Sequence, residues 1–109
     1  MNRATWTCTV VSIFQEALPV LRTMARIGIR SDFHHTTVKR VRDRLLDFCN
    51  GIDPADSDGY FEAEYEAFVD AAACCTLAMK RERMSHMQFT FLRAALQALE
   101  SVESSTTAA

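Results

Sequence analysis

The sequence has few of the residues that interrupt helices. Its 109 residues include only three glycines and two prolines. Loop-rich folds and β-sandwiches need turn residues at short, regular intervals, so this composition argues against both. The glycines, Gly28, Gly51 and Gly59, are scattered singly along the chain, and none belongs to a glycine-rich phosphate loop.

Motifs of metal, disulfide and membrane proteins are also missing. The four cysteines form no C-x-x-C pair and no Cys–His cluster with zinc spacing. Cys74 and Cys75 are neighbours, so on a helix their side chains point about 100° apart and are poorly placed to bond each other. No apolar run approaches the ~20 residues that a membrane span needs. We therefore expect a cytoplasmic protein with reduced cysteines, no metal and no cofactor.

Apolar residues recur at spacings of three and four, which predicts helices. The first helix should run from Ser12 or earlier to Ile27, with two adjacent apolar stripes and a kink at Pro19. Residues 5–10 alternate polar and apolar, so a helix and an extended arm both remain open there. Three further helices are expected, over residues 36–49, 60–83 and 86–102. A single helix from 60 to 102 is the alternative for the last two.

The length and the short connections predict how these helices are arranged. A chain of 109 residues forms one domain by ordinary length, and helices joined by short loops pack antiparallel. We expect an all-α four-helix bundle, or two packed helical hairpins, over residues 1–103. Residues 104–109 should form a disordered tail. Ser85 and Gln88 have the spacing of a capping box that starts the last helix.

Positive charge is concentrated in the first half of the chain. Residues 1–49 hold eight Lys and Arg against four acids, whereas residues 50–109 hold four against ten. The basic segment Thr37–Leu46 resembles the recognition helix of helix-turn-helix proteins, which implies that Lys39, Arg40, Arg42 and Arg44 meet DNA in the major groove. The connector before it is longer than the usual turn. The alternative is a solvated basic face, with oppositely charged halves facing each other within one chain or across a dimer.

A second resemblance is carried by two residues. Arg81 precedes His86 with four residues between them, and this spacing at a helix junction resembles the active-site motif of HEPN-domain ribonucleases. The resemblance implies that His86 is a general acid or base and that Arg81 positions the phosphodiester. Arg30 and His35 repeat the same spacing, as expected of a chance occurrence.

The apolar content exceeds what four short helices can hide. Trp6 and Phe14 belong to the wide apolar face of the first helix, and Phe89 and Phe91 lie off the inward stripe of the last. Exposed apolar area usually marks a protein interface. The sequence therefore predicts a non-enzymatic protein–protein interaction module, a regulator, inhibitor or adaptor that forms a homodimer. Nucleic-acid binding through the basic helix is the alternative, and a HEPN-like ribonuclease is the third.

Overall fold

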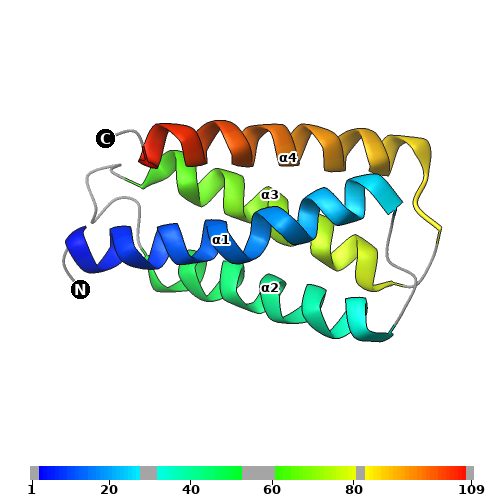
Figure 1. Ribbon diagram of the computed structural model, residues 1–109, viewed down its shortest axis with the longest axis horizontal. Coiled ribbons are helices and arrows are strands. Elements are labelled where there is room, and N and C mark those ends of the chain that lie inside the picture. The colour runs from blue at the N-terminus through cyan, green and yellow to red at the C-terminus, as the bar shows by residue number, and fades with distance from the viewer. Residues whose placement is uncertain (1–2, 28–31, 53–60, 81–82, 108–109) are drawn as a thin grey trace.

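The protein is an all-α four-helix bundle, as the sequence predicts. The computed structural model describes residues 3–27, 32–52, 61–80 and 83–107. Successive helices run in opposite directions, so the start of α1 and the end of α4 lie at the same end of the bundle (Figure 1). The part of the chain that the structure describes contains no strand. The helices are α1 (Arg3–Ile27), α2 (Asp32–Gly51), α3 (Glu62–Met79) and α4 (His86–Thr107).

The first helix is continuous through residues 5–10, so these residues form no extended arm. Trp6 packs edge-on against Phe48, with ring centroids 5.3 Å apart, and Val10 is fully buried. These contacts fix the helical period over a segment whose polar–apolar alternation also fits a strand. Pro19 lies within α1 on its exposed side.

The helix boundaries differ from the expected ones by a few residues. The second helix begins at Asp32 and ends at Gly51, so it is longer than expected at both ends. The third ends at Met79, and the backbone N–H of Lys80 closes the last turn on the carbonyl of Leu77. Lys80 and Arg83 therefore follow the helix, although the sequence predicts a helix as far as residue 83.

A capping box separates α4 from α3, which excludes one continuous helix. The backbone N–H of Gln88 donates to Ser85 Oγ at 3.1 Å, and the backbone N–H of Ser85 donates to Gln88 Oε1 at 2.8 Å. The two bonds satisfy backbone donors that a helix start otherwise leaves unpaired. The predicted capping box is confirmed.

The tail expected from residue 104 is instead helical as far as Thr107. The reason is a tertiary contact: the Thr106 hydroxyl lies 2.7 Å from Glu64 Oε1 in the first turn of α3. This contact gives the last turn of α4 a partner that the polar sequence does not reveal. Residues 108–109 lie outside the described residues.

Five aromatic rings pack together in the core and join three helices. Phe48 of α2 contacts Trp6, Phe61 and Phe68 edge-on, and Phe68 also contacts Phe14 of α1. Such edge-to-face pairs are favoured over stacked ones because ring edges are positive and ring faces negative.

Along one diagonal of the bundle α1 contacts α3, whereas α2 and α4 do not touch. The outward face of α4 is therefore remote from α2.

Candidate interaction surface

The four aromatic residues predicted to meet a partner have different surroundings. Phe14 is 2% exposed and contacts Phe68, so its assignment to a partner surface is wrong. Trp6 and Phe89 are partly buried and pack against the core. Only Phe91 is exposed, at 38%. The physical reason is that α1 packs against all three other helices, which buries both of its apolar stripes.

Phe91 belongs to a longer row of exposed residues on α4, here called the outer stripe. Its members recur at spacings of four, three, four, three and four, which places them on one side of the helix. Every member is exposed, and Met87 is the most exposed large apolar residue in the described chain, at 82%. The outer stripe consists of Met87, Phe91, Ala94, Ala98, Ser101 and Ser105.

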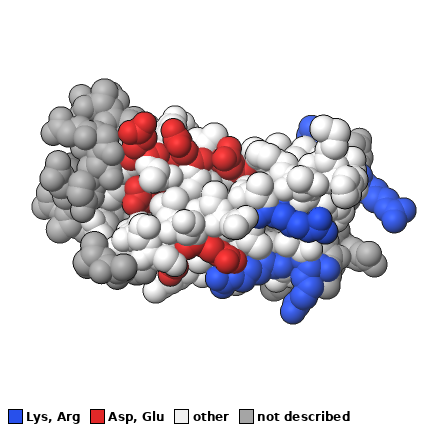
Figure 2. Space-filling model, turned by 90° about the horizontal axis from the view of Figure 1, so that it is seen from above, with Lys and Arg blue, Asp and Glu red and all other residues white. Residues whose placement is uncertain are grey.

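No member of the outer stripe is charged. The neighbouring row, Thr90, Gln97 and Ser104, is also exposed and uncharged. The ionisable side chains of α4, those of His86, Arg93, Glu100 and Glu103, point about 100° or more away from the stripe. Figure 2 looks down on α4 and shows an uncharged band along the middle of this face. An exposed helix row of this length without charge differs from an ordinary solvated face.

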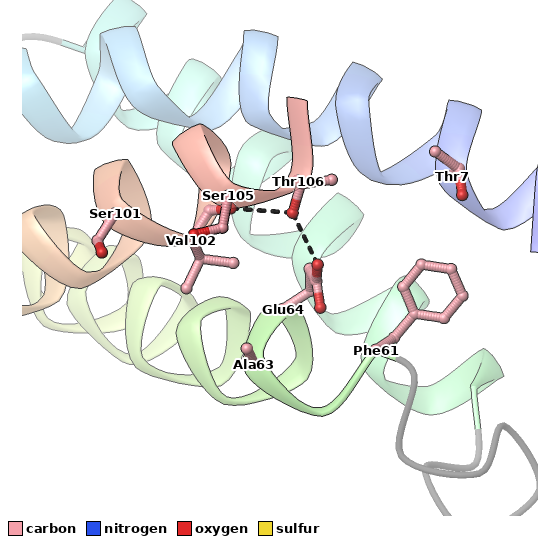
Figure 3. A pocket seen from close by; sticks show the side chains of 8 residues that line it. All are labelled: Thr7, Phe61, Ala63, Glu64, Ser101, Val102, Ser105 and Thr106. Atoms are coloured by element: carbon pink, nitrogen blue, oxygen red, sulfur yellow. Dashed lines mark hydrogen bonds between the residues drawn. The ribbon is translucent and has the colours of Figure 1, made fainter. Parts of the chain in front are cut away.

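Side-chain size changes along the outer stripe. Met87 and Phe91 stand near the start of α4, whereas Ala94, Ala98, Ser101 and Ser105 are small. Beside the small end lies a hollow of about 390 Å³. Figure 3 shows that it is bounded by α4 and by the start of α3. Its lining residues are Thr7, Phe61, Ala63, Glu64, Ser101, Val102, Ser105 and Thr106.

Glu64 is the one charged residue in this hollow and the one buried charged residue among the described residues, at 9% exposure. Its carboxylate accepts a hydrogen bond from the Thr106 hydroxyl (Figure 3). This donor offsets part of the cost of removing a carboxylate from water.

In the described residues no group of three or more His, Cys, Asp or Glu side chains could hold a metal ion.

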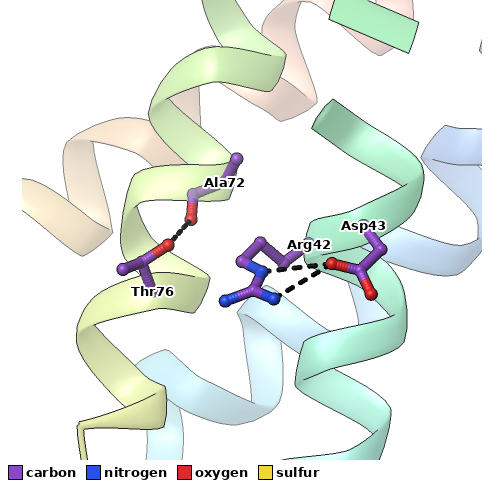
Figure 4. Close-up of polar contacts among 4 residues, drawn as sticks. All are labelled: Arg42, Asp43, Ala72 and Thr76. Carbon is purple, nitrogen blue, oxygen red and sulfur yellow. Dashed lines mark hydrogen bonds and ion pairs between the residues drawn. The ribbon is translucent and has the colours of Figure 1, made fainter. Parts of the chain in front are cut away.

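The predicted nucleic-acid residues divide into two pairs. Lys39 and Arg40 are exposed on the outward face of α2. Arg42 lies on the side of α2 that faces α3, and its Nε and Nη2 atoms donate to Asp43 Oδ1 at 3.3 and 3.1 Å (Figure 4). Arg44 turns toward α1, where Nη2 donates to Ser12 Oγ at 3.0 Å and Nε lies 3.2 Å from Glu16 Oε2. The expected row of four available cations is therefore reduced to two.

The helices around this basic segment do not have the arrangement of a helix-turn-helix motif. In that motif the two helices cross at about 90–120°. Here α1 and α2 lie alongside each other and run in opposite directions (Figure 1).

Of the HEPN-like pair, His86 is exposed at the first position of α4. Arg81 lies outside the described residues, as does Arg30 of the second such pair.

Charge is also separated along the length of the bundle. Arg26 near the end of α1 shares one end with Lys80, Arg83 and Arg93, here called the basic end. The opposite, acidic end holds the start of α3 and the end of α4, with Glu62, Glu64, Glu66 and Glu103. Arg22 and Glu100 lie between the two ends and form an ion pair at 3.2 Å. Figure 2 shows this polarity on the α4 face, with acids toward the chain termini and bases toward the other end.

Three of the four cysteines are inert by burial. Burial raises the pKa of Cys49 to about 11 and that of Cys74 to about 12. Burial also raises the pKa of Cys75 to about 12; the neighbouring Cys74 thiol raises this pKa further, and the positive charge of Arg42 lowers it. A thiol is nucleophilic only as the thiolate, so these residues act as small apolar side chains. Cys8 alone is exposed.

Comparison with known proteins identifies no relative. No family model matches the sequence, and neither the curated proteins nor the solved structures contain a match. The described helices include none with both the length and the apolar character needed to cross a membrane.

Proposed function

We propose that this chain is a helical interaction module that binds another protein through the outer stripe of α4. Such a protein acts by binding alone, as a regulator, inhibitor or adaptor of its partner. The observation that carries the proposal is the pairing of Met87 and Phe91, one helical turn apart and both exposed, in a row without charge.

Covering these two side chains is energetically favourable. Full burial of a Met or Phe side chain contributes about 1.5–3 kcal/mol relative to leaving it in water, so covering the exposed 82% of Met87 and 38% of Phe91 contributes a corresponding part of that. The exposed Leu46 of α2 and Val69 of α3 support no comparable site. Each is about 40% exposed, and each has an acidic side chain three residues earlier on the same helix face, Asp43 for Leu46 and Glu66 for Val69. Single exposed apolar residues of this kind are common on monomeric proteins.

A photo-cross-linker beside the outer stripe tests this proposal. In a Cys8→Ser background, Gln97→Cys or Leu46→Cys is labelled with benzophenone maleimide at neutral pH, where the three buried thiols stay protonated. Gln97 is exposed on the row that borders the stripe, so the label leaves the stripe itself unchanged. The position-46 probe is the matched control, because α2 and α4 do not touch. The purified protein is irradiated alone and in an extract of cells that express it.

We expect the position-97 probe to form a defined protein adduct that Phe91→Ser abolishes. The position-46 probe should form no such adduct. Equal labelling from both positions, or no adduct from position 97 under either condition, contradicts the proposal.

A further inference from the structure

We propose that the partner on the outer stripe is a second copy of this chain, docked antiparallel across a twofold axis near the middle of α4. The inference rests on the proposed function and assigns the occupant of the same surface. Three independent features of the described residues support it: side-chain size, surface shape and charge.

The outer stripe is complementary to itself only when it is reversed. Antiparallel pairing of two copies places Met87 opposite Ser105, and Phe91 opposite Ser101. The remaining layer sets Ala94 against Ala98. Each large side chain thus meets a small one, which lets two helices approach closely and fill the space between them. Parallel pairing would set Met87 against Met87 and leave the serines facing each other.

Surface shape agrees with this register. Met87 is the most exposed large apolar side chain of the described residues, and its antiparallel counterpart is Ser105, which lines the hollow beside the end of α4. Each copy therefore presents one projecting side chain and one cavity, and the twofold axis brings them together twice. Methionine suits such a space, because its unbranched side chain adapts to irregular cavities.

Charge favours the same orientation. Reversal brings the basic end of one copy beside the acidic end of the other, with Lys80 and Arg83 near the exposed Glu62 and Glu66. Parallel docking would instead set like charges together, which is unfavourable. The charge separation seen in Figure 2 thus selects the antiparallel dimer.

Engineered disulfides test both the partner and its direction. The row Thr90, Gln97 and Ser104 borders the stripe, so cysteines there leave the proposed contacts intact. In an antiparallel pair, residue 97 approaches its own counterpart, and residue 90 approaches residue 104 of the other copy. Disulfides need Cα atoms within about 7 Å, so the pattern reports the register. All variants carry Cys8→Ser and are oxidised mildly with diamide.

The antiparallel dimer predicts that Gln97→Cys alone forms a covalent dimer. Thr90→Cys and Ser104→Cys should cross-link only when the two proteins are mixed, and Asn50→Cys on α2, the collision control, should not cross-link. Without any cysteine added, Phe91→Ser should raise the dimer dissociation constant by roughly 10- to 50-fold, since each dimer covers the exposed 38% of two copies of the ring.

The alternative outcomes are distinct. Covalent dimers of Ser104→Cys alone show parallel docking and overturn the inference. If no variant cross-links but the position-97 probe captures a different protein, the self-docking inference fails and the proposed function stands. If neither experiment gives an adduct, both fail.

Discussion

The hydroxyl of Thr106 donates a 2.7 Å hydrogen bond to the carboxylate of Glu64, and this bond joins the last turn of α4 to the first turn of α3. The two residues are separated by 42 positions in the sequence. Thr106 Oγ1 also lies 2.9 Å from the carbonyl oxygen of Val102, four residues earlier, so its single hydroxyl proton is shared between the two acceptors. The bond therefore stabilises both the end of α4 and a carboxylate that is almost fully buried.

Thr106→Val should lower the free energy of unfolding by about 1–3 kcal/mol, because it leaves the buried carboxylate of Glu64 without its donor. Thr90→Val is the matched control. Thr90 also donates to the carbonyl four residues earlier, that of His86, but it is exposed and touches no buried charge. Urea unfolding followed by circular dichroism measures both. Equal losses in the two variants would contradict the role assigned to Glu64.

Ser85→Ala should lower the free energy of unfolding by about 1 kcal/mol, since it removes the acceptor for the Gln88 backbone N–H. Gln88→Ala removes the reciprocal bond. Because the two side chains stabilise the same helix start, the double variant should lose less than the sum of the single losses. Additive losses in a double-mutant cycle would show that the two bonds act independently.

Thiol reagents should distinguish Cys8 from the other cysteines. At pH 7.5 an Ellman assay of the native protein should show one reactive thiol, and the urea-denatured protein should show four. The reason is that burial keeps Cys49, Cys74 and Cys75 protonated. Rapid reaction of two or more thiols in the native protein would show that the core opens on the time scale of labelling.

The same thiols predict a loss of stability at alkaline pH. Their pKa values are raised in the folded state, so their contribution to the free energy of unfolding is complete below about pH 9 and is lost as pH rises toward 11–12. Each thiol should lower the free energy of unfolding by roughly 1 kcal/mol per pH unit in that range. Because other side chains also titrate in that range, the quantity to measure is the difference in the free energy of unfolding between wild type and Cys74→Ala as a function of pH. A pH-independent difference would contradict the prediction.

Nucleic-acid binding through α2 should be weak. Of the four basic residues of α2 predicted to bind DNA, only Lys39 and Arg40 point outward. A plot of the logarithm of the association constant for duplex DNA against the logarithm of salt concentration should therefore have a slope no steeper than about −2. Arg40→Ala should reduce that slope by about one, whereas Arg44→Ala should leave it unchanged, because Arg44 lies against Ser12 and Glu16. Fluorescence anisotropy measures the slopes. A wild-type slope near −4 would instead show that all four cations reach phosphates.

Local patterns predicted the fold. Apolar spacing and the Ser85–Gln88 capping box were enough to give four helices and the break before α4, because these features depend on neighbours within one or two turns. The end of α4 was missed because it depends on the distant pair Thr106 and Glu64. The helical state of residues 5–10 likewise depends on Trp6 packing against Phe48.

The interaction surface was predicted only in part. Phe91 was identified by its position off the inward stripe, but Phe14 was misplaced because periodicity does not show that α1 contacts three helices. Met87 was missed although its signal was in the sequence, as the first member of a second, charge-free row at spacings of four and three. The separation of charge along the bundle required the antiparallel order of the helices.

Sedimentation velocity of wild type, Phe91→Ser and Leu46→Ser tests the role of the outer stripe most directly. The two variants remove side chains of nearly equal exposure, 38% and 39%, from helices that do not touch. We expect wild type and Leu46→Ser to sediment as dimers and Phe91→Ser as a monomer of unchanged helicity. A wild-type monomer, or a Phe91→Ser protein that dimerises as tightly as wild type, would contradict the account.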